Sequence, residues 1–151
     1  MDTRGGDDLY LIPADGDPVP PAGTAVRGAL VTGGNMAPGV ARMDFNLPDI
    51  PADFKERIAA ACAVEVTADR AIRVENLPRE QALAIPDVIR TATNLLPPDL
   101  EIVRIVDIVG LDVQADGGTH VASTKQIGNI DVVKVENKGK ANRRLRIRLT
   151  D

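Results

Sequence analysis

The segment at residues 100–114, LEIVRIVDIVGLDVQ, places the strongest constraint on the fold of this chain. Its apolar residues follow one another too closely for a strand that has one face in water. Such runs are typical of strands that a sheet buries on both sides, so we predict a central strand here. The chain has 151 residues, of which 44% are hydrophobic, and this suits one soluble domain with a substantial core.

Other segments are expected to supply the neighbours of that strand. Residues 41–47 alternate apolar and polar side chains, as a half-buried strand does. Residues 130–136 and 145–149 flank the turn-rich segment NKGKAN, so we predict a β-hairpin. The remaining predicted strands are 29–32 and 71–75, with a turn at Gly33-Gly34-Asn35.

The clearest helix is expected to begin at Pro51, with Asp49 as its cap. Cys62 lies on or beside the apolar stripe of this helix, so we interpret it as a buried core thiol rather than a nucleophile. A short helix is predicted at 78–83, and a helical or irregular piece at 87–96. Strands and helices interleave without a repeating period, which predicts an α+β fold: a mixed or antiparallel sheet with helices packed on one face, forming a sandwich.

The chain divides into an arm and a globular domain. Residues 1–28 are dense in Asp, Gly and Pro and are predicted to be an irregular or extended arm, with the globular domain at 29–151. The first residues are acidic and polar, and no stretch approaches the ~20 apolar residues that cross a bilayer. We therefore expect a cytoplasmic protein with no membrane partner.

Composition also narrows the classes of function. A single cysteine excludes an internal disulfide and every Cys₂ or Cys₄ zinc motif. The net charge of -4 leaves only a local patch for nucleic-acid contact. That patch lies in residues 133–148, where one glutamate accompanies Lys134, Lys138, Lys140, Arg143, Arg144, Arg146 and Arg148. We interpret it either as a phosphate-binding surface or as a hairpin whose charged side chains keep an exposed strand edge from pairing with another chain.

The segment at 112–120, DVQADGGTH, contains the only histidine. Asp116 and His120 stand four residues apart across a turn with two glycines, so their side chains can converge. Such a pair can coordinate zinc or share a proton. The other reading is an Asp-capped turn whose histidine makes a local hydrogen bond, and the spacing alone leaves both open.

The chain from about Gly28 to Leu149 resembles the alanyl-tRNA editing proteins of the free-standing AlaX type and the related editing domains of alanyl- and threonyl-tRNA synthetases. The motifs that carry this resemblance occur in the family's order. They are VTGGNM at 31–36, RMDFNLPD at 42–49, PRE at 78–80, LPPD at 96–99, VRIVDIVG at 103–110 and DGGTH at 116–120.

The resemblance implies an editing-domain fold that hydrolyses the ester joining a wrong amino acid, usually serine or glycine, to the acceptor end of tRNA(Ala). It implies a zinc cofactor with His120 as a ligand, and it places Asp116 where the family usually has cysteine. An aspartate oxygen is a harder and weaker zinc ligand than a thiolate. Thr32 matches a family threonine that meets the seryl hydroxyl, although a β-branched residue also simply suits a strand. Expected contacts with tRNA phosphates are Lys138, Lys140, Arg143 and Arg144.

One departure from the family bears on mechanism. The family draws two further zinc ligands from a His-x-x-x-His helix before the VTGG strand, and this chain has no second histidine. The arrangement looks like an internal deletion, and two ligands fall short of the three that a catalytic zinc usually has. We expect an impaired or inactive zinc hydrolase. The missing helix should also expose apolar sheet surface, which favours a homodimer or a partner chain that covers it. The alternatives are a non-catalytic module that binds tRNA or a synthetase, and a non-functional fragment.

Overall fold

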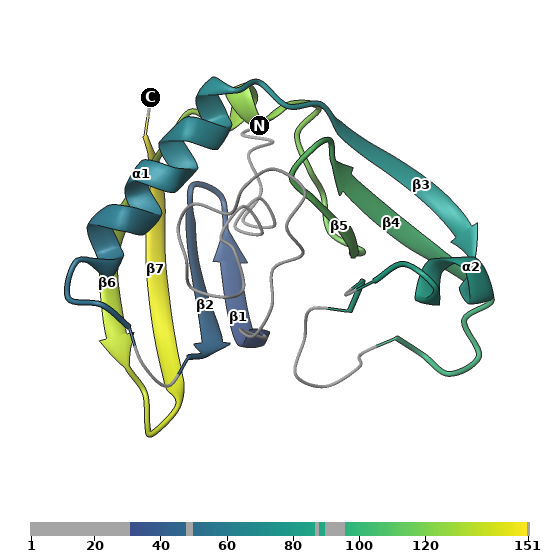
Figure 1. Ribbon diagram of the computed structural model, residues 1–151, viewed down its shortest axis with the longest axis horizontal. Helices are drawn as coiled ribbons and strands as arrows, with labels where there is room; N and C mark the ends of the chain where they lie inside the picture. Colours follow the sequence, from purple (N-terminus) through teal and green to yellow (C-terminus); the bar gives the residue numbers. More distant parts are fainter. Residues whose placement is uncertain (1–30, 48–49, 87, 90–95, 151) are drawn as a thin grey trace.

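The computed structural model describes residues 31–47, 50–86, 88–89 and 96–150. Within these residues the strands form two antiparallel sheets, one of four strands in the order β1-β2-β7-β6 and one of three in the order β3-β4-β5 (Figure 1). The strands of the first sheet are β1 (Val31–Ala37), β2 (Val40–Asn46), β6 (Asn129–Asn137) and β7 (Asn142–Thr150). Those of the second are β3 (Ile72–Pro78), β4 (Ile102–Ile108) and β5 (Asp112–Ala115).

Helix α1 (Phe54–Thr67) covers one face of the four-stranded sheet, over β6 and β7 (Figure 1). Its buried residues Phe54, Ile58 and Cys62 recur every four positions, so they share the face that meets the sheet. Burial raises the pKa of the Cys62 thiol to about 12, because an apolar environment disfavours the thiolate. The predicted helix and the buried core thiol are confirmed, although the helix begins at Phe54 rather than at Pro51.

The central-strand prediction is confirmed for β4, which lies between β3 and β5. Val103 and Ile105 pack in the cluster that includes Ala82 of helix α2 (Arg79–Leu83), while Val106 is buried on the opposite face. The apolar run does not continue as one strand, however. It turns at Gly110, whose φ of +79° suits glycine, and returns as β5. Residues 100–114 therefore hold a hairpin rather than a single strand.

The turn predicted at Gly33-Gly34-Asn35 is wrong, because these residues belong to β1 and pair with β2. The chain reverses at Pro38-Gly39, where Gly39 has a φ of +76°, and Ala37 pairs with Val40. The glycines are accommodated beside a register shift between Val31 and Gly33, which is typical of a β-bulge.

The α+β class and the β6–β7 hairpin are confirmed, and the strands are divided between two sheets. The predicted arm at 1–28 and most of the piece at 87–96 lie outside the described residues. Among the residues that the structure describes, no helix is long and apolar enough to cross a membrane.

Candidate functional site

A small pocket, with room for about one water molecule, lies on one face of the second sheet. Two cross-strand pairs form its floor: Val106 of β4 lies opposite Gln114 of β5, and Ile108 lies opposite Asp112. Paired residues of neighbouring strands point to the same side of a sheet, so these four side chains share a face. Asp116 and His120, from the loop after β5, complete the lining.

Asp116 and His120 meet inside this pocket. His120 Nε2 lies 3.1 Å from Asp116 Oδ2, and the two side chains are only 2% and 9% exposed. The other carboxylate oxygen, Oδ1, accepts the backbone N–H of Gly118 at 2.7 Å. One carboxylate therefore caps the glycine turn and also contacts the imidazole, so both features considered from the sequence are present in the same residue.

Two further polar residues of the pocket escaped the sequence reasoning. Gln114 Nε2 donates to Asp112 Oδ2 at 2.6 Å, and Gln114 is buried. The available signal was the alternation of polar and apolar residues from 112 to 115, which places Asp112 and Gln114 on one face of β5. On this face, Gln114 and Asp112 lie opposite the apolar Val106 and Ile108 of β4. Polar side chains are unusual in such an apolar setting, because burial removes their contact with water.

The residues present do not fit a zinc site. No group of three or more His, Cys, Asp or Glu side chains that could hold a metal ion occurs in the described part of the chain. Asp116 and His120 offer one oxygen and one nitrogen, and these contact each other. The only cysteine, Cys62, lies on α1 and is buried in the core of the other sheet. A catalytic zinc usually takes three protein ligands, so Asp116 and His120 by themselves do not make a catalytic zinc site.

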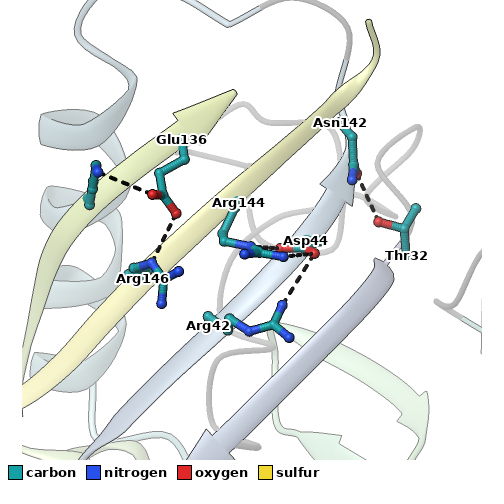
Figure 2. Close-up of polar contacts among 8 residues, drawn as sticks. Thr32, Arg42, Asp44, Glu136, Asn142, Arg144 and Arg146 are labelled. Carbon is teal, nitrogen blue, oxygen red and sulfur yellow. Dashed lines mark hydrogen bonds and ion pairs between the residues drawn. The ribbon is translucent and has the colours of Figure 1, made fainter. Parts of the chain in front are cut away.

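Thr32 lies elsewhere, at the register shift of β1. Its Oγ1 donates to Asn142 Oδ1 at 2.8 Å at an exposed position (Figure 2). Thr32 is not among the residues that line the pocket of Asp116 and His120. The structure therefore brings together two of the three residues expected at the catalytic centre and places the third against β7.

Arg144 is held by a carboxylate of the neighbouring strand. Its Nε and Nη2 donate to the two oxygens of Asp44 at 2.7 and 2.9 Å, and Arg42 approaches the same carboxylate at 3.4 Å (Figure 2). Asp44 is buried, and the hydrogen bond from Arg144 holds the pKa of its carboxyl below the usual range. We therefore assign Arg144 a role in the sheet.

The other expected tRNA contacts lie at the β6–β7 turn. Arg143 Nη1 donates to Asn137 Oδ1 at 3.0 Å and also approaches the carbonyl of Gly139 at 3.4 Å, so it braces the turn. Lys138 and Lys140 are exposed at its tip. Of the four residues, the two lysines are exposed, whereas Arg143 and Arg144 are partly buried.

The ion pairs of the sheet predict a loss of stability in acid. Hydrogen bonds from Arg146 and Lys134 lower the pKa of Glu136 from 4.5 to about 2 (Figure 2). Because the folded value lies below the unfolded one, this stabilisation is complete above pH 4.5 and is lost as the pH falls towards 2. The lowered pKa of Asp44 acts with the same sign.

We expect the urea midpoint of unfolding to fall between neutral pH and about pH 3, and to fall less in Glu136→Gln, which has no carboxyl to titrate there. Equal decreases in both proteins would contradict this assignment.

A family model matches the segment that contains the pocket. Residues 103–146 match the family model of the threonyl and alanyl tRNA synthetase second additional domain. The match begins in β4, includes β5, Asp116 and His120, and ends within β7.

Longer matches identify the relatives. The chain is 45% identical over 118 residues to the alanyl-tRNA editing protein AlaX-M of Saccharolobus solfataricus, covering 78% of this chain and 49% of that protein. It is 32% identical over 125 residues to AlaX-M of Methanosarcina acetivorans, covering 82% and 51%. An alanine–tRNA ligase of Cutibacterium acnes matches at 30% over 119 residues, covering 78% and 13%. The chain is thus a sequence relative of the alanyl-tRNA editing proteins, and it spans about half the length of the curated relatives it matches.

Proposed function

We propose that this chain is an editing domain that receives the acceptor end of mischarged tRNA(Ala) at the pocket of Asp116 and His120. We further propose that the chain by itself binds zinc weakly and is impaired as a hydrolase of Ser-tRNA(Ala) or Gly-tRNA(Ala). Its action belongs in the cytoplasm, where tRNA is charged. The similarity to AlaX-M proteins and to ligases supports the editing role.

One observation carries the proposal: the Asp116–His120 contact of 3.1 Å inside a pocket that Val106 and Ile108 also line. A carboxylate oxygen only accepts hydrogen bonds, so the Nε2 atom of His120 carries the proton of this contact. The pair can therefore orient the imidazole and hold a proton beside a bound ester. General acid–base catalysis by a positioned side chain contributes typically ~10²–10⁴-fold.

Deacylation of Ser-tRNA(Ala) tests the proposal. We compare this chain with His120→Ala, each with added zinc and with a chelator. The expected result is slow turnover that the chelator does not change and that His120→Ala loses. Fast turnover that depends on zinc would contradict the impairment. A turnover equal in both proteins would contradict the assignment of His120.

A second candidate function is a module that binds tRNA or a synthetase without catalysis. The observation that favours it is the exposed tip of the β6–β7 hairpin, where Lys138 and Lys140 stand beside the braced Arg143. Val74 and Ile102 of the second sheet are also about half exposed, which supports a covering partner or a second copy of this chain.

Salt dependence tests the binding contribution of the two lysines. In tRNA titrations, the double substitution of Lys138 and Lys140 by Gln should reduce the slope of log K against log salt by about 1 to 2, because each phosphate contact releases about one counterion. Substitution of two exposed cations away from the hairpin, Lys55 of α1 and Arg73 of β3, by Gln is the matched control. An unchanged slope in the lysine variant would exclude the hairpin tip from the tRNA surface.

A further inference from the structure

Arg104 of β4 reaches across to the turn that contains Asp116. Its Nη1 donates to the carbonyl oxygens of Asp116 at 2.8 Å and of Gly118 at 2.6 Å. The backbone carbonyl of Arg104 also accepts the N–H of Asp116 at 3.2 Å. A single residue in the middle of a central strand therefore makes three hydrogen bonds to a turn of three residues.

These bonds leave the Asp116 side chain little freedom. The backbone of Asp116 is held at both its N–H and its carbonyl, and Oδ1 is held by the N–H of Gly118. The remaining oxygen, Oδ2, is the one that contacts His120. The turn itself contains Gly117 and Gly118, whose backbones are free to adopt many conformations. Without the donor to the two carbonyls, the turn keeps only the Asp116 Oδ1 contact with the Gly118 N–H and the backbone bond from Asp116 to Arg104.

We propose that Arg104 is a positioning residue of the pocket: it fixes the turn at 116–118 so that the Asp116 carboxylate meets the His120 imidazole. Arg104 is not among the residues that line the pocket, so it acts through Asp116. The functional meaning of the inference rests on the proposed editing function, because a fixed pair matters for catalysis only if the pocket receives the aminoacyl end. The geometric part stands on the contacts alone.

Arg79, the first residue of α2, offers a matched control. Arg79 Nη1 also donates to two loop carbonyls, those of Pro97 at 2.9 Å and Leu100 at 3.2 Å. It therefore braces a loop by the same chemistry, but that loop contributes no residue to the pocket. A general loss of stability from removing such a brace affects both variants, whereas a positioning effect on His120 belongs to Arg104 alone.

The test is the hydrogen exchange of the His120 Nε2 proton, followed by ¹⁵N NMR of the imidazole. His120 is the only histidine, so all imidazole signals belong to it. In Arg104→Gln we expect this proton to exchange about tenfold faster, the factor that follows from losing one hydrogen bond to a charged group. Arg79→Gln should leave the exchange rate unchanged, and Arg104→Lys should restore part of the protection.

Two outcomes would overturn the inference: an unchanged exchange rate in Arg104→Gln, or an equal acceleration in Arg79→Gln. If Arg104→Gln does not fold, Arg104→Lys carries the test, because an ammonium that reaches only one carbonyl should still accelerate exchange relative to the parent chain. The measurement needs neither tRNA nor zinc. The measurement can therefore confirm the positioning role even if the chain has no editing activity. Failure of the positioning proposal is thus distinguishable from failure of the proposed editing function.

Discussion

Phe54→Ala is expected to lower the free energy of unfolding by about 3–5 kcal/mol, the usual range for removing a buried phenylalanine from a core. Phe54 opens α1 and is only 2% exposed, packed in the cluster that contains Met43 and Leu145. Truncation loses the transfer energy of the ring and leaves a cavity that the sheet cannot close. Since small domains are stable by about 5–15 kcal/mol in total, the variant should be close to unfolding at moderate temperature.

Urea unfolding followed by circular dichroism measures this loss. Val64→Ala is the control, because Val64 lies on the same helix but is 64% exposed. It should change the unfolding free energy by less than about 0.5 kcal/mol. Equal losses in the two variants would mean that α1 does not pack on the sheet through the face that contains Phe54.

Arg144→Gln is expected to lower the free energy of unfolding by clearly more than the loss of an exposed ion pair does, because it leaves the buried Asp44 carboxylate without its bidentate donor. The two hydrogen bonds of 2.7 and 2.9 Å join β7 to β2, where the two residues lie directly opposite each other. Arg42 remains at 3.4 Å and compensates only in part.

A double-mutant cycle with Asp44→Asn isolates the pair, and Arg148→Gln is the matched control. Arg148 contacts Asp131 at 2.7 Å, but both side chains are about half exposed, so we expect a loss below about 1 kcal/mol. Additive effects of Arg144→Gln and Asp44→Asn would contradict the assignment. The result also bears on tRNA binding, since a weaker complex in an Arg144 variant reports damage to the sheet rather than a lost phosphate contact.

The fold was predictable wherever one pattern determined the structure. The apolar positions of α1 repeat at helical spacing, and the β6–β7 hairpin has a turn-rich segment between two alternating runs. The predictions of turns and strand ends failed at glycines, because glycine occurs both in turns and in bulged strands. Gly33 and Gly34 resemble a turn but lie in a bulged strand, whereas Gly110 reverses a run that resembles one long strand.

The site was predictable only in its local part. The spacing of Asp116 and His120 across a glycine turn indicated that their side chains can meet, because four residues and a tight turn limit where they can point. The Asp44–Arg144 pair joins residues 100 positions apart, so no local pattern indicated that Arg144 would be engaged in the sheet. The brace from Arg104 to the turn likewise depends on how β4 pairs with β5.

Zinc retention tests the central claim most directly, namely that Asp116 and His120 do not by themselves make a metal site. The chain is loaded with excess zinc, passed through gel filtration and analysed for metal, beside His120→Ala. The expected result is that both proteins emerge without stoichiometric zinc. Zinc retained at one ion per chain in the parent and lost in His120→Ala would contradict the account, and would mean that further ligands complete the site around His120.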